Sequence, residues 1–220
     1  MTTLLVEDLL LLTAHPGRGT VRRPSGLALP RALAGAFIDD LAASGAARVP
    51  GSRLLLAVTP PAHPLLAQLF GRLAGHRHTL DSAIEALARP RARLGQAVLR
   101  SLTAGGAVVR HDARVLGVVP LAWHVAADLE AVQELRARVA AASRTPLDDD
   151  RASALARLVA AAELYRSVGV EPMPPVRRRA LVAADLVATE VAATIRRARR
   201  DASTGAAVAT AAAVVSASGS

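Results

Sequence analysis

The sequence predicts a mainly α-helical, compact domain with two small β-hairpins, and three observations support this fold class. Hydrophobic residues make up 52% of the 220-residue chain but aromatic residues only 2%, so the core consists of Leu, Val and Ala. Most segments place apolar residues at helical spacing. Two short Val- and Leu-rich runs follow glycines that end helical patterns, and such runs are typical of hairpins.

The N-terminal part combines four helical patterns with a basic loop and the first hairpin. Thr2 and Thr3 are suitable caps for the first helix, and Pro30 suits the first turn of the second. Pro50-Gly51 is a typical turn sequence between two strands. The predicted elements are helices at 4–12, 30–44, 65–74 and 81–87, a loop at 15–26 holding Arg18, Arg22 and Arg23, and a hairpin at 45–58.

The stretch at 86–126 holds most of the residues that we expect to bear the function. Arg89, Arg91 and Arg93 stand at alternate positions directly before an apolar run at 94–102 with helical spacing. The glycine pair at 105–106 ends this helix, because glycine adopts the left-handed conformation without strain.

A second hairpin is predicted after this helix. Its strands are the β-type runs at 108–109 and 115–119, with His111-Asp112-Ala113 as the turn. The next residues include Leu121 and Trp123, the only tryptophan of the chain. We expect these two side chains to form an exposed apolar tip.

Three long helices are predicted in the C-terminal half, at 128–142, 151–167 and 177–200. The residues after 200 are almost only Ala, Ser, Thr, Val and Gly. Such a segment buries too little apolar surface to offset its chain entropy, so we expect a mobile, low-complexity tail at 201–220. The predicted organisation is one domain at 1–200 followed by this tail.

The charge of the chain favours anionic partners. All 27 basic residues are arginines and the formal net charge is +9, which favours phosphate, nucleic acid or acidic lipid as a partner. The absence of cysteine excludes disulfides, a thiol nucleophile and thiolate metal sites. The first apolar run contains Glu7 and Asp8 and follows no basic region, so we expect a cytoplasmic protein whose membrane contact is peripheral.

Four phrases together resemble the Golgi phosphoprotein 3 family, and the likeness is greatest to its short bacterial members. They are TTLLVEDLLLLTA, LAGAFIDDLAASG, the RxRL pattern at a helix start and VLGVVPLAWHVAAD, in an order that holds over about residues 2–200. The resemblance implies a mostly helical domain that acts as an adaptor and not as an enzyme. Eukaryotic members bind the phosphatidylinositol 4-phosphate headgroup in a basic pocket and insert an apolar hairpin tip into the bilayer.

The residues of that family pocket carry over in part. An aromatic residue of the family loop has no counterpart at 17–25, and Ala34 stands where the family has an arginine, with Arg31 one turn earlier. The resemblance therefore implies a general anion site rather than strict inositol specificity. The implied headgroup-binding residues are Arg89, Arg91, Arg93, Arg31, Arg22 and Arg23, and the implied membrane-insertion residues are Leu121 and Trp123.

Two non-enzymatic alternatives stay open. A basic helix followed by a two-stranded wing is also typical of winged-helix nucleic-acid binding. Against this, the helix at 94–102 offers few side chains that could contact base edges, and aromatic residues for stacking are scarce. The other alternative is a homo-oligomer that associates through the second hairpin without lipid.

Enzymatic activity has weaker support. His76 and His78 form a pair without a third ligand at metal-site spacing, and 148–150 resembles a helix cap. The chain contains neither a nucleophile-elbow pattern nor a phosphate-binding glycine motif. We therefore predict no catalytic residue, cofactor or metal. The arginine groups at 177–179 and 196–200 are interpreted as solvated helix faces.

Overall fold

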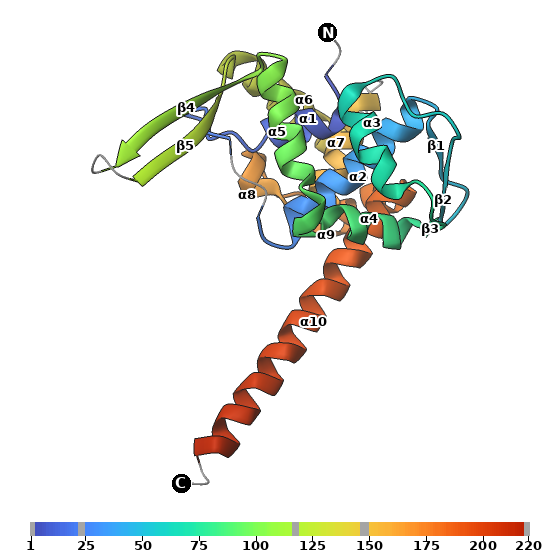
Figure 1. Cartoon of the computed structure of the whole chain (residues 1–220), viewed down its shortest axis with the longest axis vertical. Coiled ribbons are helices and arrows are strands. Elements are labelled where there is room, and N and C mark those ends of the chain that lie inside the picture. The colour runs from blue at the N-terminus through green and yellow to red at the C-terminus, as the bar shows by residue number, and fades with distance from the viewer. Residues whose placement is uncertain (1–2, 22–24, 116–118, 146–149, 218–220) are drawn as a thin grey trace.

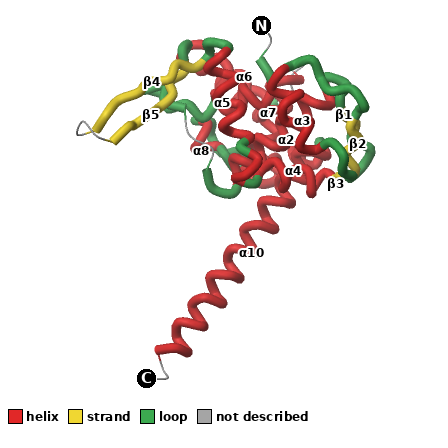
Figure 2. The backbone as a smooth tube through the Cα atoms, viewed as in Figure 1, coloured by secondary structure: helices red, strands yellow, loops and turns green. Residues whose placement is uncertain are grey.

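The computed structural model describes residues 3–21, 25–115, 119–145 and 150–217, with side chains described through residue 204 except at 113–121. The α-helices are α1 (Leu5–Leu11), α2 (Ala28–Ala43), α3 (Pro64–Leu73), α4 (Leu80–Ala88), α5 (Leu94–Ala104), α6 (Leu129–Arg144), α7 (Asp150–Ala162), α8 (Tyr165–Val168), α9 (Pro175–Ala183) and α10 (Leu186–Ala217), and η1 (Pro90–Ala92) is a 3-10 turn. The strands are β1 (Ala47–Arg48), β2 (Arg53–Leu56), β3 (His78–Thr79), β4 (Val108–Val115) and β5 (Val119–Ala126). The predicted fold class, mainly α with small hairpins, is confirmed (Figure 2).

Helix α2 lies at the centre of the globular body (Figure 1) and contacts α1, α4, α7 and α10. Leu33, Phe37 and Leu41 lie at helical spacing on one face of α2 and are fully buried, and so is Ile38 on a neighbouring face. A helix that is apolar on nearly all sides is stable only when other elements surround it. The other helices therefore pack around α2.

Buried carboxylates attach α1 to this centre. Asp40 of α2 accepts hydrogen bonds from the backbone N–H groups of Leu5 at 2.8 Å and Val6 at 2.9 Å. These N–H groups lie in the first turn of α1, where they have no partner within the helix. Asp8 of α1 accepts a hydrogen bond from Arg151 Nε of α7 at 2.6 Å. Asp40 of α2 and Asp8 of α1 therefore join α1 to α2 and to α7.

The strands form two separate antiparallel sheets. The first has the order β1-β2-β3, and β3 lies between the helices predicted at 65–74 and 81–87, where no strand was predicted. The second consists of β4 and β5 and extends away from the helical body (Figure 1). At its base, Val21 N–H donates to His124 O at 2.8 Å and Ala126 N–H donates to Gly19 O at 2.9 Å. The N-terminal loop thus pairs with one edge of this hairpin.

The turn of the second hairpin was predicted at the wrong place. His111 pairs with Trp123 and Asp112 with Ala122, so the expected turn at 111–113 is part of β4. The segment 111–113 contains no glycine or proline, whereas Gly117 stands between the two strands in the sequence. A strand that stands in solvent on both faces needs no alternation of apolar and polar residues, and polar residues inside it therefore resemble a turn.

Two predicted long helices are each divided in the structure. The segment predicted as one helix at 151–167 contains α7 and α8, which are separated at Glu163. The segment predicted at 177–200 contains α9 and the start of α10. Asp185 lies directly before α10 and accepts a hydrogen bond from Ala188 N–H at 2.7 Å. This bond caps the new helix and explains where it begins.

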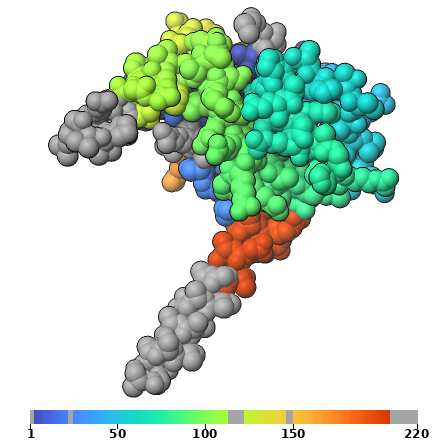
Figure 3. Space-filling model, in the orientation of Figure 1, coloured from blue at the N-terminus to red at the C-terminus, as the bar shows by residue number. Residues whose placement is uncertain are grey.

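Helix α10 begins in the body and then projects from it (Figure 1). In Figure 3 the described part of α10, in orange-red, stands out from the globular body. The expected domain boundary at residue 200 falls within this helix, whose backbone continues to Ala217. Among the described residues, no helix is long and apolar enough to cross a bilayer.

Candidate functional site

The three arginines at 89, 91 and 93 lie on the short connection from α4 to α5. Arg89 follows α4, Arg91 lies in η1, and Arg93 directly precedes α5; all three are exposed. Arg72 of α3 donates from Nη1 to the carbonyl oxygen of Arg91 at 3.1 Å, which holds the connection against α3. The sequence order alone therefore suffices to place these guanidinium groups on one short segment.

Arg93 has a left-handed backbone with φ 52° and ψ 27°. For residues with a Cβ this conformation is less favourable than the right-handed one by roughly 1 kcal/mol or more. It occurs here because the chain must end η1 and begin α5 at the same residue. Such local strain is often found at functional sites, which makes Arg93 the most notable backbone position of the segment.

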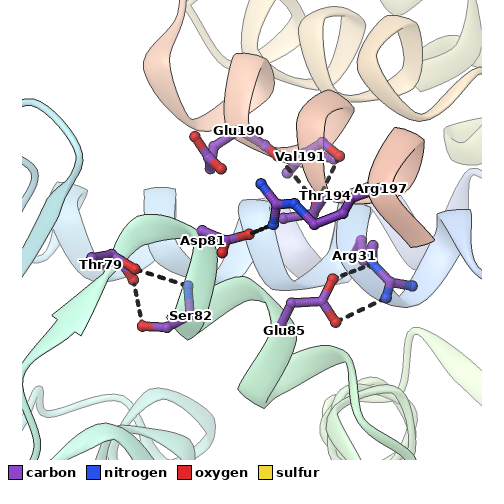
Figure 4. A network of polar contacts seen from close by, with 9 residues as sticks. All are labelled: Arg31, Thr79, Asp81, Ser82, Glu85, Glu190, Val191, Thr194 and Arg197. Atoms are coloured by element: carbon purple, nitrogen blue, oxygen red, sulfur yellow. Dashed lines mark hydrogen bonds and ion pairs between the residues drawn. The ribbon is translucent and has the colours of Figure 1, made fainter. Parts of the chain in front are cut away.

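Arg31 is held by a carboxylate instead of facing solvent alone. Figure 4 shows its guanidinium group facing Glu85 of α4, with Nε–Oε1 at 2.7 Å and Nη2–Oε2 at 2.8 Å. Its remaining Nη1 donates to the carbonyl oxygen of Leu27 at 2.9 Å. The same view shows a second ion pair, between Asp81 of α4 and Arg197 of α10. Arg31 thus belongs to an interhelical network, and its partner Glu85 lies one turn before Arg89, whose backbone N–H donates to Glu85 O at 3.2 Å.

Three of the proposed site residues fall partly or wholly outside the described structure. Arg22 and Arg23 lie outside the described residues. For Leu121 only the backbone is described, and it pairs with Ala113 in the β4–β5 ladder. Their assigned roles stay predictions.

Trp123 lies within strand β5 and is partly exposed. Its ring stacks on the ring of His111 from β4, with centroids 5.7 Å apart and planes inclined by 13°. Cross-strand ring pairs of this kind stabilise a two-stranded sheet. One face of the indole is therefore occupied by its neighbour on β4, and the ring lies along the hairpin instead of at its turn.

The arginine segment and the hairpin lie at opposite ends of α5. Arg93 directly precedes this helix, whereas Gly105 follows it and leads into β4. Helix α5 has 11 residues, which corresponds to a length of about 16 Å. Figure 1 shows the hairpin leaving the body at the C-terminal end of α5. A single flat surface must therefore span at least this length to contact both parts.

A partly buried group of charges lies near the start of α10. Burial, with help from the charges of Asp185 and Asp40, raises the pKa of Asp39 from 3.8 to about 8, while Arg157 acts in the opposite direction. Burial likewise raises the pKa of Asp40 to about 6, against the effect of its two backbone N–H donors. Arg157 Nε lies 3.6 Å from Asp185 Oδ2. Asp39 of α2, Arg157 of α7 and Asp185 before α10 thus interact through their charges where the three helices meet.

The structure also brings together a basic site that was not predicted from the sequence. Arg178 of α9 and Arg199 of α10 both contact the carboxylate of Glu163 at the end of α7. The sequence showed these arginines only as parts of charged runs. A possible signal was the acidic residue in an otherwise Ala- and Leu-rich helical pattern, but nothing local connected it with residues 15 and 36 positions away.

Potential metal ligands do not gather in the part of the chain that the structure describes. No group of three or more His, Cys, Asp or Glu side chains there could hold a metal ion. The rings of His76 and His78 lie 6.1 Å apart and are tilted by 49° to each other.

Comparison with known families is informative over most of the chain. The sequence model of the family described as Golgi phosphoprotein 3 (GPP34) matches residues 5–202. A search of curated proteins gave no match. The family match begins at the first residue of α1 and ends within α10, so it includes both hairpins and the arginine segment. From this coverage we conclude that the chain belongs to the Golgi phosphoprotein 3 (GPP34) family.

Proposed function

We propose that this protein is a peripheral membrane adaptor that binds anionic phospholipid headgroups. Arg89, Arg91 and Arg93 contact the headgroups, and the β4–β5 hairpin contributes apolar contact. The observation that carries the proposal is the exposure of three arginines on one short connection. Within the described residues, no acidic side chain forms an ion pair with any of the three.

The energies involved favour a reversible attachment. A basic side chain near an anionic membrane surface contributes about 1 kcal/mol, and salt weakens this contribution. Three arginines alone thus give weak binding. A tryptophan ring prefers the headgroup level of a bilayer, so Trp123 adds an apolar contribution. Two weak contributions together are sufficient for a peripheral anchor, as with paired lipid anchors.

The proposed lipid is an anionic phospholipid of the phosphatidylinositol 4-phosphate type. Membership of the Golgi phosphoprotein 3 family supports a phosphoinositide, because the resemblance implies that headgroup for eukaryotic members. Ala34 in place of the family arginine, and the bidentate contact of Arg31 with Glu85, favour a broader selectivity. We propose the cytoplasmic side of a membrane as the location, with the helical body presenting a second surface to a protein partner.

Cosedimentation with vesicles tests this proposal. The vesicles contain phosphatidylcholine alone, or phosphatidylcholine with either phosphatidylglycerol or phosphatidylinositol 4-phosphate. The test variant replaces Arg89, Arg91 and Arg93 by Gln. A matched control replaces three exposed arginines of the other sheet region, Arg48, Arg53 and Arg77, so that both variants lose the same charge.

The expected result is that the wild-type chain and the control bind anionic vesicles, whereas the 89/91/93 variant binds at least about fivefold more weakly. Trp123→Ala, made in the wild-type chain, is also expected to weaken binding to the anionic vesicles. Equal binding by the two triple variants would contradict the proposal. Binding to duplex DNA at physiological salt without vesicle binding would favour the winged-helix alternative. Light scattering that shows an oligomer lost in Trp123→Ala, without vesicle binding, would favour self-association.

A further inference from the structure

A second basic cluster lies at the junction of α7, α9 and α10. The connection between α9 and α10 consists of Ala184 and Asp185 only, and the two helices contact each other and α7. Arginines from both helices consequently face the end of α7. This cluster involves none of the residues of the segment at 89–93.

Glu163 shows that the cluster holds an oxyanion. Its Oε1 contacts Arg178 Nη1, and its Oε2 lies 3.0 Å from Arg199 Nη1. Each carboxylate oxygen is thus paired with a different guanidinium group. The hydrogen bond from Arg199, together with the charge of Arg178, holds the pKa of Glu163 below its usual range. The group is therefore an anion at neutral pH, placed between two cations.

The backbone of Glu163 is unusual in the same way as that of Arg93. Its φ is 55°, a left-handed conformation, and these two are the only non-glycine residues with positive φ in the part of the chain that is described. At the end of a helix this conformation is normally provided by glycine. A glutamate here accepts strain that a glycine would avoid, and its carboxylate reaches the arginines as a result. Strain at a residue that also places a charged group is typical of a binding site.

A pocket of about 260 Å³ adjoins this carboxylate. Among the described residues, four arginines line it, namely Arg178, Arg179, Arg196 and Arg199, whereas Glu163 is the only acidic side chain in the lining. Val182 and Ile195 supply apolar surface in the same lining. A single carboxylate leaves three positive charges uncompensated. The volume lies just below the range typical of drug-sized ligands, so the pocket suits a small anion with a short organic part.

The buried hydroxyl group of Tyr165 is influenced by the same charges, but Tyr165 is not among the described residues that line the pocket. Tyr165 is 6% exposed, and its hydroxyl oxygen has no hydrogen-bond partner among the described residues. Burial raises the pKa of Tyr165, and Arg178 and Glu163 are the charged groups that act on it. Buried polar groups without a partner are uncommon in folded proteins. Since Tyr165 is not among the described lining residues, the proposed site does not include this hydroxyl.

We propose that this pocket binds a phosphomonoester group, with Glu163 as an internal competitor. The incoming phosphate takes the place of the carboxylate between Arg178 and Arg199, and Arg179 and Arg196 neutralise its remaining charge. A phosphomonoester carries more negative charge than a carboxylate and has three acceptor oxygens, which match a set of four guanidinium groups. Arginine forms paired hydrogen bonds with phosphate oxygens particularly well. The site is separate from the proposed headgroup segment and does not depend on it.

A phosphomonoester group occurs in soluble phosphate esters and in the headgroup of phosphatidic acid. Calorimetric titration of the full chain with glycerol 3-phosphate tests the soluble source. Cosedimentation with phosphatidylcholine vesicles, with and without phosphatidic acid, tests the lipid source. The variants are Arg178→Gln, Arg199→Gln and Glu163→Gln, and Arg48→Gln serves as a charge-matched control outside the pocket.

The decisive variant is Glu163→Gln. Removal of the competing negative charge is expected to strengthen glycerol 3-phosphate binding by about tenfold. Arg178→Gln and Arg199→Gln are each expected to weaken it by about tenfold, and Arg48→Gln to leave it unchanged. Should Glu163→Gln fail to fold, Glu163→Gly removes the same carboxylate while it relieves the backbone strain. The 89/91/93 triple variant retains glycerol 3-phosphate binding, which separates this site from the proposed membrane contact.

Binding in the vesicle arm alone, with the same order of variants, supports the site and assigns the lipid source. Three outcomes overturn the proposal. One is the absence of binding in both arms by the wild-type chain and by both Glu163 variants. Another is unchanged binding in Arg178→Gln and Arg199→Gln. The third is weaker binding in Glu163→Gln, as expected if the carboxylate only supports the structure.

Discussion

Arg31 and Glu85 are 54 residues apart in the sequence and form a two-point ion pair that joins α2 to α4. Both hydrogen bonds are short, at 2.7 and 2.8 Å, and the two side chains are 12% and 30% exposed. Paired geometry and partial burial are the conditions under which an ion pair contributes to stability. Arg31 thus has a structural role in addition to any contact with a ligand.

A double-mutant cycle with Arg31→Ala and Glu85→Ala measures this contribution. We expect a coupling energy of about 1 kcal/mol, because the pair is bidentate and partly withdrawn from water. Arg110 and Asp112 form an exposed pair in β4, with side chains 57% and 64% exposed, and serve as the control. Their coupling is expected to be below about 0.5 kcal/mol. Urea unfolding provides the free energies, and equal coupling for the two pairs would contradict the assigned role.

Replacing Gly35 by Ala is expected to destabilise the fold. A Cβ atom at this position would lie 2.6 Å from Val191 Cγ2 of α10 and 3.0 Å from Leu158 Cδ2 of α7. The helices must move apart to accommodate it, at a cost of about 1–3 kcal/mol. Gly71 in α3 is the matched control, because a Cβ there meets no atom within 4 Å. Gly71→Ala is expected to stabilise α3 by about 0.5–1 kcal/mol. Thermal unfolding of both variants checks the opposite signs.

Asp39 is expected to make the protein less stable as the pH rises. Its pKa is about 8 in the folded chain against an ordinary value of 3.8, so the folded state retains a proton that the unfolded state has lost. Since the folded state binds more protons between these values, the free energy of unfolding falls as the pH rises. Above about pH 8 both states are ionised and this dependence ends.

The variant Asp39→Asn is expected to remove this loss. Asp40 has a pKa of about 6, so between about pH 6 and pH 8 it is largely ionised in the folded state and adds little to the change of stability with pH. Across this window the free energy of unfolding of the wild-type chain is expected to fall by on the order of 2 kcal/mol relative to that of the variant. Urea unfolding at both ends of the window measures the difference, with exposed Asp112→Asn as the control. Parallel curves for Asp39→Asn and the wild-type chain would show that Asp39 does not titrate there.

Replacing Arg136 by Met is expected to destabilise the chain by about 2–4 kcal/mol. The guanidinium group of this 7% exposed residue donates to the carbonyl oxygens of Leu12, Ala14 and Val168. The Met side chain preserves much of the volume but leaves three buried acceptors without this donor. Arg144→Met, at an exposed site on the same helix, is expected to change stability by less than about 0.5 kcal/mol. Similar losses in both variants would show that the carbonyl contacts contribute little.

Local patterns predicted the elements whose causes are local. The apolar spacing after Arg93 and the two glycines at its end were sufficient to define α5, which spans Leu94–Ala104 as expected. Asp128 was likewise expected at the start of a helix, and it caps α6 by accepting from Ala131 N–H at 2.9 Å. The arginine segment follows from sequence order alone, since Arg89 to Arg93 lie on a single connection.

Local patterns failed where a distant contact decides the backbone. The break at Glu163 contains no glycine or proline, and contacts with Arg178 and Arg199 accompany its left-handed conformation. The start of α10 had a local signal, because Asp185 is a good helix cap, but continuous apolar spacing on both sides concealed it. The hairpin turn was misplaced because the described residues of β4 after Val108 are exposed, so no burial pattern fixes the register there.

The sequence by itself determined the helical fold class, the family and the basic connection before α5, because helix spacing, glycine positions and residue order are properties of short segments. Only the tertiary structure decided that Arg31 is paired with Glu85, that Trp123 stacks on His111 within a strand, and that arginines of α9 and α10 surround Glu163. The physical reason is that charges and rings select partners by distance and burial. Both are set by how the helices pack around α2, which no single segment of the chain specifies.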